Sequence, residues 1–384
     1  MAHLVFPLIT TFIMYGVVTP YLPIMVRSLG YSPSTVGILL GVFEGAGIAG
    51  PFLFGFFADR WGQYKPGLIV MYVLMIASAL PLALFFSPLI SALFLAVLAI
   101  GFRSAIPMLD AVITINLGKN GNYGKIRTVG SASFIVMVLF LQWTHFLRPD
   151  TSFNIALWIT ISAALALVSM SLIPSKYTGR GKVTITPKDG NTKTGSIWSP
   201  LFIMGLVIIF LSRLAMAPVN GFLSMYVTEE LHWDATGLIW AISSLAEVPV
   251  MYISWRLIRR FGALPLLVFT TLMVGVRLGI YAVFPFKPGV IAAQLLHSFC
   301  YGLFHPAAVA FISGSVPPER RAMGMSLYLS LGTGLPTLLG NIMGGFIIEH
   351  WGYRLLFISY TVFPLIAMGI YFFMIAKTRR RCYL

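Results

Sequence analysis

The chain has 384 residues, of which 58% are hydrophobic and only 10% are charged, and its mean hydropathy is +0.89. Soluble globular proteins carry about 25% charged residues, so this composition argues against a soluble domain and indicates a polytopic membrane protein. The two cysteines, Cys300 and Cys382, lie far apart with no ligand cluster beside them, so neither a disulfide nor a metal site is expected.

Twelve apolar segments follow one another along the chain, and each is about as long as a helix that crosses a bilayer. A helix satisfies its backbone hydrogen bonds within its own segment, which a hydrocarbon environment requires. The sequence therefore predicts an all-α polytopic membrane protein with twelve transmembrane helices, over residues 4–26, 34–58, 67–86, 88–117, 125–147, 152–174, 200–227, 235–257, 264–284, 288–315, 322–348 and 354–376.

The net charge of +15 comes from basic residues that gather on one side of the predicted membrane. Nineteen of the 26 lysines and arginines lie in one set of loops, at the adjoining segment ends or in the C-terminal tail, four lie in the opposite loops or at their segment ends, and three lie in the interior of segments. Cytoplasmic loops carry such an excess of Lys and Arg. We therefore expect both termini in the cytoplasm, and the basic excess requires no nucleic-acid partner.

The longest polar stretch, 175–199, separates the sixth and seventh segments and is rich in Gly, Thr and Lys. We therefore expect a six-helix bundle over 1–174, a flexible cytoplasmic linker over 175–199 and a second six-helix bundle over 200–384. The halves also resemble each other, because residues 34–62 align with 234–262 at an offset of 200. Parallel repeats of six spans are typical of the major facilitator fold.

The loop after the second segment, GFFADRWGQYK (55–65), resembles the motif G-x-x-x-D-R-x-G-x-x-K/R of the major facilitator superfamily. The resemblance implies that the acid caps a neighbouring helix end and steadies one of two alternating states. In the second half, Arg259 stands where the acid would be. A charged turn that only enforces topology is the alternative. The motif residues are Gly55, Asp59, Arg60, Gly62 and Lys65.

Charged residues inside the apolar segments are functional candidates, because a charge at mid-membrane is costly unless it faces a partner or a wet cavity. Three acids and three arginines meet this description, together with two histidines of the tenth segment. The alternative is a set of ion pairs that only hold helices together. The residues are Glu44, Arg103, Asp110, Arg213, Glu247 and Arg277, with His297 and His305.

Arg103 and Asp110 are seven positions apart and therefore share one face of the fourth segment. They are about 10 Å apart along the helix axis, which is too far for a direct ion pair. We expect both side chains to look into the same cavity. Glu44 of the second segment is a further candidate for solute binding.

Residues 107–134 carry a closer resemblance. The runs PMLDA and YGKIRTVGSASF are similar to the sugar-binding segment of the lactose permease family, and more so to the phenylpropionate and nucleoside proton-symporter branch of the same superfamily. The resemblance implies that Asp110 and Arg127 contact the solute and that Phe134 stacks on its ring. A carboxylate accepts hydrogen bonds from hydroxyl groups, a guanidinium binds oxygens as a fork, and an aromatic face packs against a ring.

The second half resembles proton-coupling segments of the lactose permease family in the runs MVGVRLGIY and QLLHSFC. The resemblance gives Arg277 and His297 a part in proton coupling, and His305 is a further candidate. Cys300 stands where that family has its proton-carrying Glu, so we expect Glu247, in SLAEVPV, to take over that role. A carboxyl group in a low-dielectric site holds its proton more readily than in water, as a proton carrier requires.

These observations predict a proton-coupled symporter of a bacterial inner membrane that imports a sugar, a nucleoside or an aromatic acid by alternating access. A proton-independent facilitator or exporter, or a lipid-handling transporter of the same fold, stays open as an alternative. An enzyme is not expected, because the sequence shows no Ser/His/Asp arrangement or metal-ligand cluster. The expected partners are a small solute, protons and membrane lipid, without cofactor or nucleic acid, and the chain is expected to act as a monomer.

Overall fold

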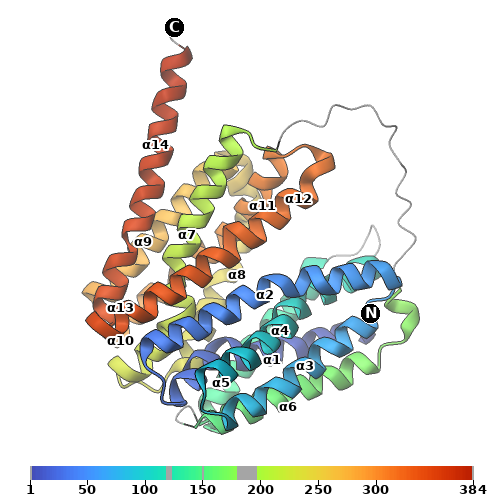
Figure 1. Cartoon of the computed structure of the whole chain (residues 1–384). Helices are drawn as coiled ribbons and strands as arrows, with labels where there is room; N and C mark the ends of the chain where they lie inside the picture. Colours follow the sequence, from blue (N-terminus) through green and yellow to red (C-terminus); the bar gives the residue numbers. More distant parts are fainter. Residues whose placement is uncertain (1, 118–122, 149–150, 180–196, 383–384) are drawn as a thin grey trace. The chain divides into compact units, whose positions relative to one another are not determined.

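The computed structural model describes residues 2–117, 123–148, 151–179 and 197–382. Long helices account for most of these residues, and no strand occurs among them (Figure 1). The expected all-α architecture is therefore confirmed. It follows from the apolar runs, since a helix is the structure that keeps every backbone donor and acceptor paired inside lipid.

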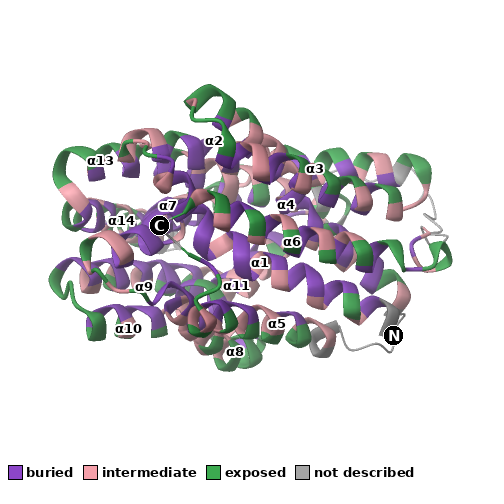
Figure 2. Ribbon diagram, turned by 90° about the horizontal axis from the view of Figure 1, so that it is seen from below, coloured by how far each residue is buried: buried purple, intermediate pink, exposed green. Residues whose placement is uncertain are grey.

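The chain forms two compact units. Unit 1 holds residues 1–190 and the short stretch 235–241, and unit 2 holds residues 191–234 and 242–384. In both units the buried positions follow helix sides that face neighbouring helices, while exposed positions follow the opposite sides (Figure 2). Each unit thus has a core of its own, built from one face of each helix.

Unit 1 consists of six long helices and a short 3-10 turn, which are α1 (Ala2–Ser28), α2 (Pro33–Trp61), α3 (Lys65–Leu84), α4 (Pro88–Leu117), α5 (Tyr123–Thr144), α6 (Ser152–Ser171) and η1 (Ser175–Tyr177). Within it, α2 packs on α4, α3 packs on α4 and α6, and α1 packs on α5 and α6. Local signals set the helix starts. The Ser32 hydroxyl accepts a hydrogen bond from the Thr35 amide, and proline occupies the first turn of α2 and α3.

Unit 2 contains most of α8 (Thr236–Phe261) and the whole of α7 (Pro200–Met225), α9 (Ala263–Val283), α10 (Lys287–Leu295), α11 (Phe304–Ser315), α12 (Arg321–Leu327), α13 (Leu335–Tyr360) and α14 (Val362–Cys382). Its short elements are η2 (Tyr226–Glu230), η3 (Ser298–Leu303), η4 (Pro318–Arg320) and η5 (Tyr328–Gly334). Inside the unit, α7 and α9 pack on each other and on α13 and α14. Three of the short elements, η2, η3 and η5, are π turns.

Eleven described stretches are long and apolar enough to cross a membrane. The last of them, Met323–Ala376, has 54 residues, whereas one crossing needs about 20. This stretch therefore has the length for two crossings. It also contains a break at Gly352, where φ is +77°. The break lies between the last two predicted segments, 322–348 and 354–376, so the predicted count of twelve fits the observed helices.

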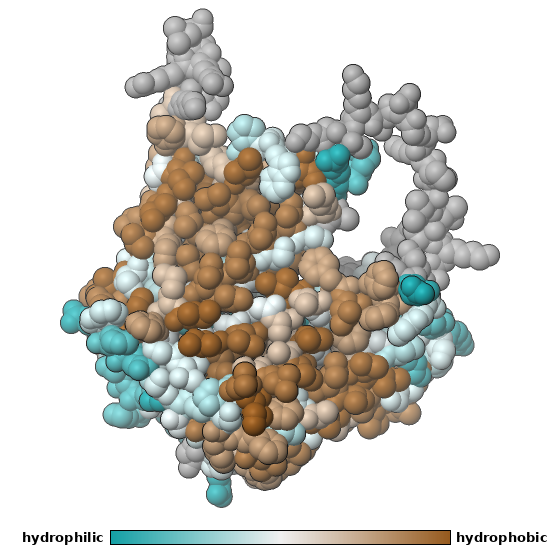
Figure 3. Space-filling view, viewed as in Figure 1, coloured by the Kyte–Doolittle hydropathy of each residue, from teal (hydrophilic) through white to brown (hydrophobic). Residues whose placement is uncertain are grey.

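Large apolar side chains cover much of the face that Figure 3 shows. Many leucines and aromatic residues, such as Phe86, Leu89 and Trp143, are exposed. Hydrophilic residues gather at the margins of the same view (Figure 3). A soluble monomer rarely exposes so much contiguous apolar surface, and side chains of this kind are suited to contact with lipid tails.

Both ends of the predicted linker, 175–199, are attached to folded structure. At the first end, the Tyr64 amide donates to the Thr178 carbonyl at 2.9 Å, and Thr178 is fully buried. At the other end, Ile197 is buried and belongs to the apolar core of unit 2. The two ends are therefore parts of the units, and residues 180–196 lie outside the described part of the chain.

Candidate functional site

Asp110 and Arg127, the predicted solute-binding pair, form an ion pair in unit 1. Asp110 lies on α4 and Arg127 on the first turns of α5, and Nη1 of Arg127 donates to both carboxylate oxygens, at 3.1 and 3.2 Å. The guanidinium also lies 4.7 Å from the centre of the Phe12 ring on α1. The two charged side chains keep 26% and 32% of their area exposed, so neither is sealed inside the unit.

Glu44 and Arg103 form a second ion pair, which joins α2 to α4. The Arg103 guanidinium also lies 5.5 Å from the ring centre of Phe43 and 5.7 Å from that of Phe102. Gly47 permits this approach, because a Cβ at that position would collide with the Arg103 side chain. The pairing and the ring contacts both lower the cost of holding a guanidinium among membrane helices.

The predicted shared face of α4 is present, but its two charges take different partners. Arg103 reaches across to α2 and Asp110 reaches across to α5. The spacing along α4 correctly excluded a direct pair between them, whereas the expectation of one shared cavity overlooked both partners. The four residues make two ion pairs, so unit 1 holds its interior charges in balance.

Phe134 on α5 and Tyr15 on α1 are two aromatic residues on helices that carry residues of this site. Phe134 lies two turns beyond Arg127 on α5 and is half-buried, and its stacking on a solute ring stays a prediction. Tyr15 on α1 contacts Phe102 of α4 and was not predicted from the sequence. Its hydroxyl donates to the Phe102 carbonyl at 2.6 Å, and its ring stacks on Phe102 at 4.0 Å between centres. No motif or unusual spacing marks Tyr15 in the sequence.

A second group of polar residues surrounds Arg277 of α9, which is 1% exposed in unit 2. Its Nε donates to the Tyr281 hydroxyl at 3.3 Å, its Nη1 lies 3.0 Å from Nδ1 of His297, and its Nη2 donates to Oε1 of Gln294. The Tyr281 hydroxyl also donates to Oε1 of Gln294, at 3.2 Å. Each nitrogen of the guanidinium thus has a partner, as a buried cation requires.

Glu247, the expected proton carrier, lies on α8 beside His297. Oε2 of Glu247 and Nε2 of His297 are 3.9 Å apart. Gly302 permits the approach of the two helices, because a Cβ at that position would come within 2.8 Å of Cγ of Glu247. One ring nitrogen of His297 faces Glu247 and the other faces Arg277. Three of the four residues predicted for proton coupling therefore form one connected group.

His305, the fourth of these residues, lies further along the same face. Its Nδ1 is 3.0 Å from the Tyr328 hydroxyl of η5. The rings of His297, Tyr301 and His305 are stacked in succession, with centres 5.5 and 6.4 Å apart. Residues four apart on a helix are neighbours, so the spacing of these three aromatic side chains could have indicated the stack from the sequence.

The tenth predicted segment, 288–315, is not one continuous helix. The regular helix α10 ends at Leu295 and α11 begins at Phe304, with the π turn η3 between them. On this turn the Cys300 carbonyl accepts a hydrogen bond from Nη2 of Arg213 on α7, at 2.8 Å. π turns are frequent at functional sites, and this one lies between the two histidines of the stack.

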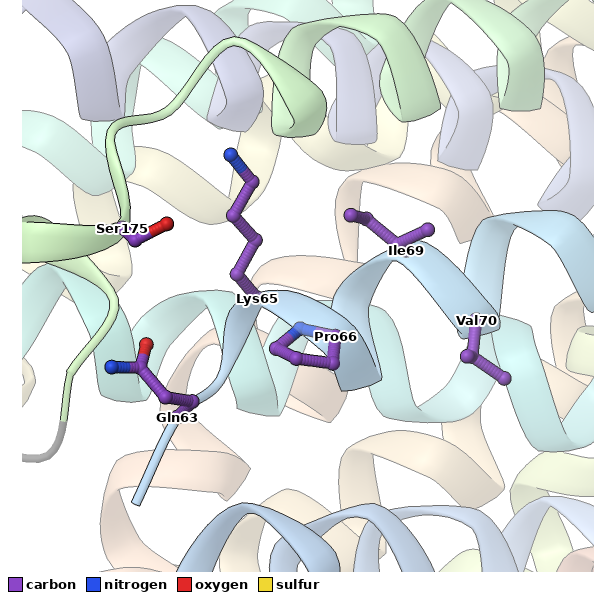
Figure 4. A pocket seen from close by; sticks show the side chains of 6 residues that line it. All are labelled: Gln63, Lys65, Pro66, Ile69, Val70 and Ser175. Atoms are coloured by element: carbon purple, nitrogen blue, oxygen red, sulfur yellow. The ribbon is translucent and has the colours of Figure 1, made fainter. Parts of the chain in front are cut away.

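The loop motif after α2 shows a physical role for two of its residues. Gly62 ends α2 with φ at +65°, a left-handed conformation that glycine adopts without steric cost. Lys65 extends from the start of α3 toward the end of α6 (Figure 4), where its Nζ donates to the carbonyls of Ser171 and Ile173 at 2.8 and 2.6 Å. A cation there offsets the negative end of the helix dipole.

The remaining motif residues have less defined surroundings. Arg60 is exposed, Gly55 is half-buried, and the Asp59 side chain lies outside the described part of the structure. The lysine of the motif therefore caps a neighbouring helix end, and the same role for the acid stays a prediction. A cavity of about 600 Å³ lies beside Lys65 (Figure 4), lined also by Gln63, Pro66, Ile69, Val70 and Ser175.

A known protein family matches most of the chain. The family model described as "MFS_1 like family" matches residues 4–359. The chain belongs to the MFS_1-like family. This result confirms the predicted major facilitator superfamily membership, which rested on the repeat and on the loop motif.

Relatives of the MFS_1-like chain are transporters. The maltose permease of Geobacillus stearothermophilus is 26% identical over 290 residues, which are 74% of this chain and 72% of the permease. The probable 3-phenylpropionic acid transporter of Escherichia coli (strain K12) is 26% identical over 358 residues, 90% of each chain. A crystal structure of a variant of the nucleoside transporter NupG superposes with a TM-score of 0.81 at 15% identity, over 96% of this chain and 98% of that one.

These matches establish the class of the protein. It is a multi-pass membrane transporter with the fold of the major facilitator superfamily, as its apolar helices and its family require. Its relatives are permeases and transporters, which move solutes without converting them. The predicted solute classes, the coupling to protons and the cytoplasmic position of the termini stay predictions.

Proposed function

We propose that this MFS_1-like chain is a proton-coupled symporter that imports a small polar or aromatic solute by alternating access. The observation that carries the proposal is the connected group Glu247–His297–Arg277 in the middle of membrane-spanning helices. Ionisable side chains are costly in that environment, and where they occur they commonly mark ion or proton pathways. The group therefore has the composition of a site that takes up and releases a proton.

The carboxyl group of Glu247 is the proposed carrier. When it is ionised, its negative charge faces His297 and, beyond the ring, the cation of Arg277. When it is protonated, that charge disappears, while Arg277 keeps its uncharged partners Gln294 and Tyr281. Protonation therefore changes the charge balance of unit 2 without leaving the arginine unpaired. A bound proton shifts the balance between two conformations only if it changes the free energy of one of them more than that of the other. A change in the charge of unit 2 can have this effect.

Asp110, Arg127 and Phe134 are the proposed solute contacts in unit 1, with Glu44 and Arg103 beside them. An ion pair that keeps about a quarter to a third of its area exposed can exchange part of its mutual hydrogen bonding for bonds to a solute. The relatives are named for maltose and 3-phenylpropionic acid, and NupG for nucleosides. All three solute types combine a ring with oxygen atoms, which matches an acid, a guanidinium and an aromatic face.

Uptake into proteoliposomes tests the proposal. Purified protein is reconstituted, a pH gradient is imposed, and accumulation of radiolabelled maltose, 3-phenylpropionate and uridine is followed. We expect one of these solutes to accumulate against its gradient, and accumulation to stop when an ionophore collapses the pH gradient. Accumulation that is indifferent to the ionophore would rule out proton symport.

The first mutational prediction concerns Glu247→Gln, which keeps the size of the side chain but cannot release a proton. We expect accumulation driven by the pH gradient to be lost, while exchange of labelled for unlabelled solute continues. The matched control is Glu230→Gln, since Glu230 is an exposed acid at the end of η2. Loss of both accumulation and exchange in Glu247→Gln, with folding intact, would assign Glu247 a structural role instead.

A proton-independent facilitator or exporter is the second candidate. The observation that favours it is the complete coordination of Arg277 by uncharged groups, which holds the cation without any change at Glu247. The ionophore experiment separates the two candidates, because a facilitator equilibrates its solute but does not concentrate it. In either case we propose action as a monomer in a bacterial inner membrane without an organic cofactor, and for the symporter the proton gradient is the proposed energy source.

A further inference from the structure

The interior charges of unit 1 balance one another. Glu44 is paired with Arg103, and Asp110 is paired with Arg127. Among the described residues, Glu44, Arg103 and Asp110 lie well inside the membrane-spanning helices of unit 1, and Arg127 lies on the first turns of α5. Unit 1 therefore needs no further charge from a ligand.

Unit 2 is different, because the described residues in the middle of its helices, away from helix ends and from the break at Gly352, include two arginines and one acid. Arg213 lies near the middle of α7, Arg277 on α9 and Glu247 on α8. With both histidines neutral, one positive charge is left over when Glu247 is ionised, and two are left over when it is protonated. An uncompensated charge among membrane helices is expensive. The excess therefore indicates that an anion completes the site.

Arg213 is the cation without a counter-charge. Its residue is 3% exposed, Nη2 donates to the Cys300 carbonyl, and the guanidinium lies 3.7 Å from the ring centre of Phe304. Its Nε is buried and has no hydrogen-bond partner among the described residues. A buried donor without a partner carries a free-energy penalty, and a carboxylate oxygen is an acceptor that would remove it.

Cys300 lies between the two cations. Its carbonyl accepts a hydrogen bond from Nη2 of Arg213 at 2.8 Å, and its side chain lies within hydrogen-bonding reach of Arg277. Cys300 is fully buried and brings no charge at neutral pH. Two like charges thus flank a small neutral side chain on the π turn η3.

We propose that the transported solute is an organic carboxylate, and that its anionic group binds in unit 2 beside Cys300, between Arg213 and Arg277. The inference rests on the proposed function to the extent that it names the solute class of that transporter. A carboxylate brings the missing negative charge and matches the fork geometry of a guanidinium. A neutral sugar or nucleoside would leave the excess charge in place.

Tyr301 lies beside Arg213 and reaches the exposed surface. Its side chain is 43% exposed and its ring lies 6.0 Å from Cζ of Arg213, which is itself buried. The Tyr301 ring is therefore both exposed and close to a buried cation. Tyr301 is part of η3, so a change in the π turn would displace the ring and uncover the guanidinium.

Ligand-induced stabilisation of the full-length protein in detergent tests the solute class. Thermal unfolding is followed at pH 7.5 with 3-phenylpropionate, benzoate and hexanoate, each compared with its own amide, and with maltose and uridine. We expect at least one carboxylate to raise Tm with an apparent affinity at least about tenfold better than that of its amide, the loss expected when a charge partner is missing. Stabilisation by neutral solutes alone, or by none of the compounds, overturns the proposal.

Cys300→Glu locates the site, with Cys300→Gln as the matched control of the same size. The introduced carboxylate should occupy the place of the solute anion, raise Tm in the absence of ligand and abolish stabilisation by the carboxylate. The Gln variant fills the same space without the charge, so it should weaken carboxylate binding but should not raise Tm in the absence of ligand. Equal carboxylate binding by the Glu variant and the wild type overturns the proposed position.

Arg213→Gln gives a second measurement that does not depend on fitting a larger side chain. It removes the excess charge, so we expect the preference for carboxylate over amide to fall at least about tenfold, and an unchanged preference overturns the proposal. Failure of the proposed proton symport and failure of the proposed carboxylate site give different results. A carboxylate that binds and exchanges but ignores the pH gradient sinks the proton coupling alone, whereas proton-driven accumulation of a neutral solute sinks the carboxylate alone.

Discussion

At the scale of single residues, the interior cations of both units are arginines, and each one uses the geometry of its guanidinium. Arg277 directs three nitrogens at three different side chains, and Arg127 places a phenyl ring against its face while it binds a carboxylate. A lysine offers one point charge and could not make these contacts. The choice of arginine over lysine therefore determines which contacts stabilise each interior positive charge.

The sequence was sufficient to find the charged residues of the site and to group Glu247 with His297 and Arg277, but it did not pair Glu44 with Arg103. Glu44, Asp110 and Glu247 stand out because each interrupts an apolar run. The ion pair of Glu44 with Arg103 depends on how α2 packs on α4, and packing leaves no mark at the charged position itself. Arg213 shows the same limit, since its contact is a backbone carbonyl, which every residue possesses.

The ion pair of Asp110 and Arg127 allows a prediction about single residues. Asp110→Asn leaves Arg127 without its ionised partner, so we expect solute binding to be lost and the protein to lose about 1 kcal/mol of stability, since polar pairs between membrane helices contribute about that much. The double variant Asp110→Asn with Arg127→Gln should recover stability but not binding. Thermal unfolding and solute exchange in proteoliposomes measure the two quantities.

Arg148→Gln is the matched control for that experiment, because Arg148 is an exposed residue of a loop. It should leave both stability and exchange unchanged. If the double variant recovers exchange as well as stability, the pair only holds α4 to α5, and its place in the solute site is withdrawn.

At the scale of elements, the apolar runs were enough to place the long helices, because length and hydropathy decide which segments span a bilayer. They were not enough to reveal the π turn η3, which changes neither the composition nor the length of its segment. The signal was present in another form, as the aromatic residues His297, Tyr301 and His305 at a spacing of four. The end of α2 was easier, since Gly62 is part of the loop motif.

Two glycines of that motif allow a prediction about helix ends. Gly62 has φ at +65°, and no described atom lies within 4 Å of a Cβ built there or at Gly55, which is within the helix. Gly62→Ala should therefore destabilise the protein by about 1 kcal/mol through backbone strain alone. Gly55→Ala should leave stability unchanged or raise it by up to about 1 kcal/mol.

Thermal unfolding of the two variants side by side checks this prediction. Gly62→Asn is a useful third variant, because Asn tolerates the left-handed conformation better than Ala, and it should lie between the wild type and Gly62→Ala. Equal destabilisation by Gly55→Ala and Gly62→Ala would show that these positions require glycine because space around the motif is limited, and not because of the backbone conformation at Gly62.

At the scale of the whole molecule, features that extend over many residues were the most predictable. The repeat at an offset of 200 and the loop motif led to the superfamily that the family model matches over residues 4–359. The attachment of the linker ends was not predictable, because it depends on single contacts, such as the Tyr64 amide with the Thr178 carbonyl. Long-range patterns average over many positions, whereas one contact can be made by almost any loop sequence.

The distribution of lysine and arginine leads to the last prediction, which concerns orientation. The predicted side of the C-terminus follows from the basic excess in one set of loops and in the tail. Cys382 ends α14 and Cys300 is fully buried, so the natural cysteines already provide a probe and an internal control. A membrane-impermeant thiol reagent should label Cys382 in inside-out vesicles, leave it unlabelled in intact spheroplasts, and leave Cys300 unlabelled in both.

Ser87→Cys in a Cys382→Ser background should give the reverse, since residue 87 lies in a loop of the opposite set. Labelling of Cys382 in intact spheroplasts would place the C-terminus outside and would mean that the basic loops follow a rule other than retention of positive charge in the cytoplasm.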